Sequence, residues 1–187
     1  MLSLIHAISR GSVWITGALL LLSAVLVGSE VLMRNFFHYS FGGVDEISSY
    51  IFAIGVAWSL AFTLLSRAHI RIDLIYGKLG PRWRAALDIL SLACLLAVTG
   101  LLFQQALETT LTSYEIGARS NTPLGVTLWV PQTLWTAGLG FFALVQLYLL
   151  VSIVRLFIAN NVRQITALSG VKSMDEEIED EIDEAKT

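Results

Sequence analysis

Four stretches of this chain contain no Asp, Glu, Lys, Arg or His, and each is at least 19 residues long. They run from Gly11 to Ser29, Ile47 to Ser66, Ile89 to Leu107 and Ser120 to Val154. A helix needs roughly 20 mainly apolar residues to cross about 30 Å of hydrocarbon. The sequence therefore predicts an all-α integral membrane protein with four transmembrane helices.

The last stretch is too long for one span and too short for two spans with a turn. Its opening, Ser120 to Gly125, is typical of a loop. We place the fourth span at about 129–151, with Pro131 in the first turn, where a missing N–H costs little. The other spans are expected at about 11–33, 47–66 and 85–107, within a membrane domain covering residues 1–158.

The charged residues predict the orientation. Ten of the 12 Lys and Arg residues flank the predicted spans on one side, and only Arg34 and Arg119 lie on the other. By the positive-inside rule, both termini and the loop between the second and third spans are cytoplasmic.

The first span is expected to be retained, because its apolar run is too long for a cleavable signal. Residues 159–187 are expected to form a disordered cytoplasmic tail, since residues 175–184 include eight acids.

Several kinds of chemistry are disfavoured. Cys94 is the only cysteine, which excludes disulfide scaffolds and multi-cysteine metal sites. No ionisable residue falls in the middle of a span, which argues against an ion or proton path. His6, His38 and His69 lie outside the apolar runs, so haem ligation within the bilayer is not expected. We therefore expect no catalytic residue, substrate site, metal or cofactor, and no nucleic-acid partner.

Small residues recur every four positions on two faces of the second span: Ala53, Ala57 and Ala61 on one, Gly55, Ser59 and Thr63 on the other. In lipid, small residues at this spacing mark close contact between helix backbones. The second span is therefore expected to lie between two neighbours. The alternatives of a generic packed helix and a dedicated partner surface stay open. Gln104 and Gln105 in the third span are expected to hydrogen-bond across helices.

The charged residues near the outer ends of the first two spans have local explanations. Glu30 and Arg34 are spaced for an exposed i,i+4 pair, with a partner contact as the alternative. Asp45 and Glu46 open the second span, where carboxylates cap free N–H groups and face the positive end of the helix dipole. A metal or acid–base pair is the alternative, but no His or Cys accompanies them.

The segment between the second and third spans fits either a strand or a short helix. The helical interpretation aligns its apolar residues along one stripe, which would let the segment lie at the membrane interface. His69 and Asp73 would then lie four residues apart and hydrogen-bond each other. Pro81 ends the segment, and Trp83 is expected to anchor the third span at the interface.

Taken together, the motifs resemble those of the small membrane (Q-type) subunit of tripartite ATP-independent periplasmic (TRAP) transporters. The resemblance covers about residues 8–158 and rests on an ordered set: Arg34-Asn35, Asp45-Glu46-Ile47, His69 to Asp73, Ser120 to Gly125, and Trp129 to Gln132. It implies a bacterial inner-membrane complex with a large membrane subunit and a periplasmic substrate-binding protein. Such complexes import organic acids, including dicarboxylates, keto acids or sialic acid, with an ion gradient that is usually Na⁺.

The resemblance further implies that the small subunit is a non-catalytic scaffold. Its candidate interface or structural residues are then Arg34, Asp45, Glu46, His69, Arg71, Asp73, Pro123 and Pro131. Loss of transport on mutating the charged members of this set is expected to reflect assembly. The main alternative is a self-sufficient four-helix proton-coupled exporter, for which Glu30 is the one candidate acid. A membrane enzyme or electron carrier is the third hypothesis.

Overall fold

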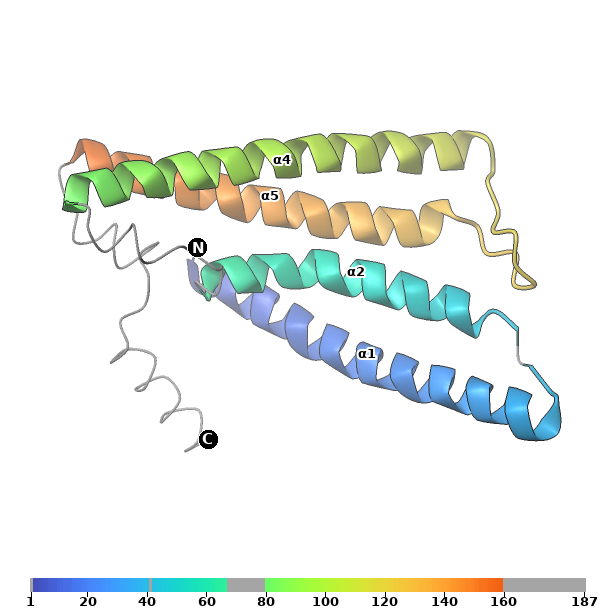
Figure 1. The fold of residues 1–187 in the computed structure, drawn as a ribbon. Coiled ribbons are helices and arrows are strands. Elements are labelled where there is room, and N and C mark those ends of the chain that lie inside the picture. Colours follow the sequence, from blue (N-terminus) through green and yellow to red (C-terminus); the bar gives the residue numbers. More distant parts are fainter. Residues whose placement is uncertain (1, 41, 67–79, 160–187) are drawn as a thin grey trace, which may run out of the picture.

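The structure, a computed structural model, describes residues 2–40, 42–66 and 80–159. In these ranges the chain forms four helices: α1 (Leu2–Phe37), α2 (Val44–Leu65), α4 (Pro81–Glu115) and α5 (Trp129–Ile158) (Figure 1). All four are long and apolar enough to cross a membrane. This confirms the predicted all-α membrane fold. The predicted interfacial segment and acidic tail lie outside the described residues.

Glycine and proline mark the helix ends. The residue before α2 is Gly43, whose φ of 85° is a left-handed conformation that glycine adopts readily. α4 begins at Pro81, and Pro131 lies in the first turn of α5 as predicted, both at positions where a missing N–H costs little. α4 ends just before Gly117, whose φ of 61° is typical of the residue that terminates a helix.

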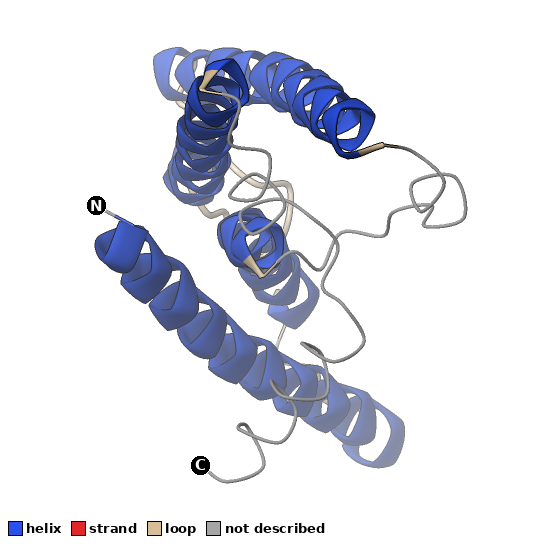
Figure 2. Cartoon of the chain, turned by 90° about the vertical axis from the view of Figure 1, so that its left-hand side faces the viewer, coloured by secondary structure: helices blue, strands red, loops and turns tan. Residues whose placement is uncertain are grey.

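The helices pack side by side in the order α1, α2, α5, α4. Figures 1 and 2 show this order as a curved layer, with the two hairpins α1–α2 and α4–α5 meeting along α2 and α5. In the described part of the chain, α1 makes no extensive contact with α4 or α5, and α2 makes none with α4. The four helices therefore form a layer one helix thick and not a closed bundle.

Buried residues recur every seven positions along α1: Ser9, Thr16, Ser23 and Glu30. A seven-residue repeat keeps one face of a helix against its neighbour through a left-handed supercoil. The small members of the repeat allow α2 to approach closely, and a Cβ atom at Gly55 would overlap Thr16. α1 therefore packs on α2 through a narrow polar seam and leaves most of its apolar side chains exposed.

α2 and α5 meet where their side chains are small. A Cβ at Gly138 would lie 3.0 Å from Ala57 Cβ, and Trp58 Nε1 donates a hydrogen bond to Leu134 O at 3.0 Å. The Trp58 ring also stacks on Phe141, with centroids 5.8 Å apart. The prediction that the second span lies between two neighbours is confirmed, since Gly55 faces α1 whereas Ala57 and Ala61 face α5. Ala53, which has the same four-residue spacing as Ala57 and Ala61, is exposed and does not share their contact with α5.

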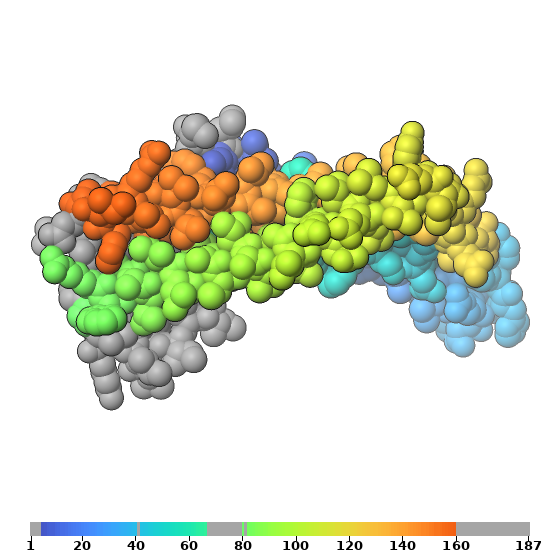
Figure 3. All heavy atoms as spheres, turned by 90° about the horizontal axis from the view of Figure 1, so that it is seen from above, coloured from blue at the N-terminus to red at the C-terminus, as the bar shows by residue number. Residues whose placement is uncertain are grey.

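The α4–α5 seam also has a seven-residue repeat of buried residues on α4: Ala85, Leu92, Thr99, Ala106 and Ser113. Two polar pairs cross it. Gln146 Nε2 donates to Thr99 Oγ1 at 3.0 Å, and the hydroxyls of Thr110 and Thr136 are 3.0 Å apart. Gln104 does not bond to another helix of the described chain, contrary to the prediction, but donates to Glu108 on its own helix. Figure 3, which looks onto this edge of the layer, shows the side chains of α4 and α5 lying against one another along the helices.

Gln146 is fully buried, and only one of the two polar groups of its side-chain amide is hydrogen-bonded. Its Nε2 donates to Thr99, whereas its Oε1 has no hydrogen-bond partner among the described residues. We expect Thr99→Val to lower the free energy of unfolding by about 1–2 kcal/mol, because the amide then loses its remaining partner. The double variant Thr99→Val/Gln146→Leu is expected to be close to neutral, since it replaces both buried partners with apolar side chains. Reversible unfolding of the purified chain in detergent measures both. Equal losses from the two variants would contradict this account.

Candidate functional site at the loop end of the helix layer

The two hairpin loops, residues 38–43 and 116–128, lie at the same end of the layer, opposite the N-terminus (Figure 1). We call this the loop end. Glu46, in the first turn of α2, joins this helix to the 116–128 loop. Its Oε1 accepts a hydrogen bond from the Tyr50 hydroxyl at 2.6 Å, and its Oε2 accepts one from Thr122. The Ser120 hydroxyl lies next to that of Thr122.

The 116–128 loop is a short hairpin that presents these hydroxyls. Arg119 and Thr127 form an antiparallel bridge, and Ser120 N donates to Val126 O at 2.9 Å. Gly125 turns the chain with a φ of 55°. At the tip, the hydroxyls of Ser120 and Thr122 are 2.8 Å apart, so that both lie beside Glu46. A carboxylate with several hydroxyl donors is a strong hydrogen-bond acceptor.

The two residues before α2 make room for this hairpin. Pro123 lies against Gly42, where an added Cβ would be 3.7 Å from the proline ring. Leu124 lies so close to Gly43 that an added Cβ would overlap it. Gly43 is therefore required both for its left-handed conformation and for its lack of a side chain.

Glu30 forms a second polar cluster at the same end. It is the last member of the α1 seam and is only 3% exposed. Its Oε1 accepts hydrogen bonds from Arg34 at 2.9 Å and from the Ser40 hydroxyl. The predicted Glu30–Arg34 pair is confirmed, but the expectation that it is exposed is wrong for the acid.

The capping role predicted for the two acids of α2 is not observed as a hydrogen bond. The residue that caps α2 is Gly43, with no side-chain capping bond. Asp45 has an exposed side chain, whereas Glu46 is used to hold the 116–128 hairpin. Both acids remain in the first turn, where the helix dipole favours them.

The structure brings four predicted site residues to the loop end: Arg34, Asp45, Glu46 and Pro123. Pro131 lies nearby and is buried within the first turn of α5. His69, Arg71 and Asp73 lie outside the described residues.

Comparison with known families identifies the chain. A family model described as the DctQ component of tripartite ATP-independent periplasmic transporters matches residues 23–156. The chain belongs to this family. Comparisons with curated proteins and with solved structures give no match. The resemblance seen in the motifs is confirmed, and this DctQ-family chain is a multi-pass membrane component of a TRAP transporter.

In this DctQ-family chain the match covers α1 from residue 23, all of α2 and α4, both hairpin loops, and α5 up to residue 156. The loop-end residues Glu30, Glu46 and Thr122 all fall within it.

The contact between Glu46 and Thr122 was not predicted from the sequence, because the two residues are 76 positions apart. Asp88, near the start of α4, was also missed, and it is only 4% exposed. The one available signal for Asp88 was its position three residues after Ala85, on the face that the seven-residue repeat buries.

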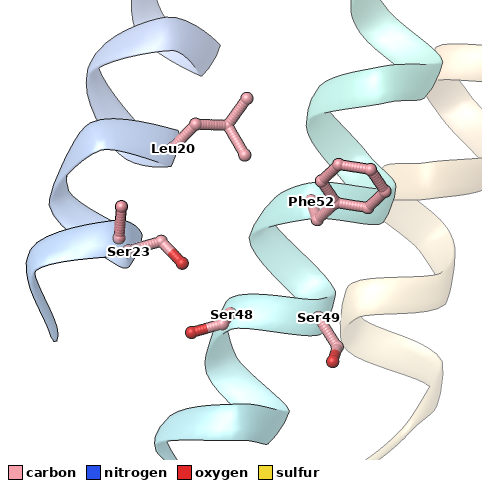
Figure 4. Close-up of a pocket in the computed structure, with 6 residues that line it drawn as sticks. Leu20, Ser23, Ser48, Ser49 and Phe52 are labelled. Atoms are coloured by element: carbon pink, nitrogen blue, oxygen red, sulfur yellow. The ribbon is translucent and has the colours of Figure 1, made fainter. Parts of the chain in front are cut away.

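A cleft separates α1 from α2 towards the loop end (Figure 4). It has a volume of about 400 Å³ and is lined by Leu20, Ser23, Ala24, Ser48, Ser49 and Phe52. The residues that the structure describes contain no group of three or more His, Cys, Asp or Glu side chains placed to hold a metal ion.

Proposed function

We propose that this chain is the non-catalytic scaffold subunit of a binding-protein-dependent secondary transporter. The transporter would import organic acids, such as C4-dicarboxylates, keto acids or sialic acid, with an ion gradient. Its partners would be the large membrane subunit and a periplasmic substrate-binding protein. The family membership supports the transporter class, and the layered fold supports the scaffold role.

The observation that carries the scaffold role is the single layer of helices. Transport sites in secondary transporters lie near the membrane midplane between packed helices, some of which are broken. In the described part of this chain the helices make extensive contacts only with their neighbours in the layer, so the four helices do not close around a common space. The polar pairs that cross the α4–α5 seam, Gln146 with Thr99 and Thr110 with Thr136, are neutral. Such a layer suits a rigid support for a partner that carries the transport site.

The exposed surface of α4 favours one side of the layer for that partner. Gln104, Gln105 and Glu108 are exposed, and Gln104 and Glu108 lie on the opposite side of α4 from the buried repeat that faces α5. Amide side chains in a transmembrane helix commonly hydrogen-bond to another helix, and carboxylates are rarely exposed to lipid. The large subunit would supply these contacts.

Uptake by proteoliposomes tests the scaffold role. The large subunit, the binding protein and this chain are reconstituted together, and each is omitted in turn. Uptake should require all three components, and liposomes with this chain alone should transport nothing. Proton-coupled transport by this chain alone would instead establish the exporter alternative. Glu30 is the acid that alternative needs, and its bonds to Arg34 and Ser40 favour a structural role.

We infer that the loop end is periplasmic and that both termini are cytoplasmic, in the bacterial inner membrane. The excess of Lys and Arg at the opposite end supports this orientation. In a Cys94→Ala background, Asn121→Cys at the exposed hairpin tip should react with a membrane-impermeant maleimide added to spheroplasts. Ala159→Cys, which is exposed after α5, should react only after permeabilisation. The reverse pattern of labelling would mean that the orientation is inverted.

A further inference from the structure

Ser23 differs from four other serines of α1 and α2. The hydroxyls of Ser12, Ser29, Ser48 and Ser49 each donate to the backbone carbonyl four residues earlier. Among the described residues, the Ser23 hydroxyl has no hydrogen-bond partner, although the residue is only 6% exposed. The fully enclosed side-chain atoms without a partner in the described residues belong to Gln132 and Gln146, so the Ser23 oxygen is open to the space beside it. The Ser23 hydroxyl is therefore available to donate a hydrogen bond to a ligand there.

The Ser23 hydroxyl points into the cleft between α1 and α2. Figure 4 shows it directed from α1 towards α2, with Leu20 and Phe52 further along the same cleft. The other two serines of the cleft, Ser48 and Ser49, already bond to their own helix. The cleft of about 400 Å³ thus combines one available polar group with otherwise apolar or satisfied walls.

The cleft lies within charge-free stretches of both helices but close to charged residues at the loop end. Asp45 precedes Ser49 by four residues, which places it on the same face of α2, one turn nearer the loop end. Arg34 follows Ser23 by 11 residues, or three turns, so it projects from the same face of α1. Its side chain leans back towards the helix N-terminus and hence towards the cleft. Arg34 and Asp45 are both exposed and carry opposite charges.

We propose that this cleft binds one zwitterionic phospholipid. An acyl chain lies between Leu20 and Phe52, and an ester carbonyl accepts a hydrogen bond from Ser23. The phosphate lies near Arg34 and the amine near Asp45. The lining residues span only 20–24 on α1 and 48–52 on α2, about 6 Å of helix at 1.5 Å per residue. A transmembrane helix of a partner is about 10 Å wide with its side chains and needs a longer groove, so a single acyl chain fits better.

Native mass spectrometry of the full chain tests this proposal. The protein is purified in detergent, stripped of lipid, and reconstituted into nanodiscs that contain phosphatidylethanolamine or phosphatidylglycerol. The wild type should retain one phosphatidylethanolamine. The double variant Ala24→Leu/Ser49→Leu fills the cleft from two exposed positions and should lower the lipid-bound fraction at least ten-fold. Ser23→Ala should weaken binding about five-fold, the effect of one neutral hydrogen bond.

Ser29→Leu is the matched control, because Ser29 is exposed on α1 and does not line the cleft. It should retain the lipid as the wild type does, and circular dichroism should show that all variants are folded. Equal retention by the filled variant would overturn the proposal, as would preferential retention of phosphatidylglycerol. The proposal would also be overturned if a helix of the large subunit occupied the cleft in the complex. A disulfide between Ala24→Cys and a cysteine of that subunit would detect such a helix.

Discussion

Gly138→Leu should separate the two helical hairpins. An added Cβ would lie 2.8 Å from Trp58 Cδ1 and 3.0 Å from Ala57 Cβ, both on α2. The α2–α5 contact is the one extensive contact that joins the hairpins among the described residues, and the variant would also strain the bond from Trp58 Nε1 to Leu134 O. Overpacking of this kind costs about 1–3 kcal/mol. We expect a loss of about 3 kcal/mol in the free energy of unfolding, measured by denaturation in mild detergent.

Gly100→Leu is the control for this prediction. Gly100 lies in the middle of α4, and a Cβ there would meet no atom within 4 Å. The substitution also replaces glycine with a better helix former, so the stability should stay within about 1 kcal/mol of the wild type. If both glycine variants lost stability equally, close packing at Gly138 would not be what joins the hairpins.

Glu46→Gln should release the 116–128 hairpin from α2. The glutamine keeps the size of the side chain but replaces one acceptor oxygen with an NH₂ group and removes the charge that strengthens the bonds from Tyr50 and Thr122. We expect amide hydrogen exchange in residues 118–127 to become at least several-fold faster. Association with the large subunit should weaken in parallel, because the hairpin would no longer be held in one conformation.

Asp45→Asn is the matched control for this second prediction. Asp45 is the adjacent acid, it carries the same charge, and its side chain is exposed. Loss of the Asp45 charge should leave amide hydrogen exchange in residues 118–127 unchanged. Equal acceleration in both variants would mean that net charge at the start of α2, and not the Glu46 hydrogen bonds, orders the hairpin.

The helices and some of their contacts were predictable because they depend on local sequence. The charge-free stretches indicated the four helices, and Pro131 marked the start of α5. The small residues Gly55 and Ala57 indicated close neighbours on two faces of α2, since close approach in lipid requires small side chains. The Glu30–Arg34 pair followed from its i,i+4 spacing.

The side-chain contacts between helices were not predictable, because they depend on which faces meet. Glu46 had a sufficient local explanation at the start of a helix, and nothing in the sequence linked it to Thr122. Gln146 and Gln104 lie in similar apolar surroundings, yet only Gln146 bonds across helices. The buried repeat on α1 consists of three small polar residues and an acid, which a search for apolar periodicity does not detect. The side-by-side order of the helices required the structure itself.

Co-purification with the large membrane subunit tests the scaffold role most directly. The tagged chain is co-expressed with that subunit, solubilised in mild detergent and analysed by size-exclusion chromatography. We expect the two proteins to elute as one defined complex, with less complex formed by Glu46→Gln than by Asp45→Asn. Elution of this chain alone as a stable oligomer, with the large subunit well expressed in the same membranes, would contradict the scaffold role.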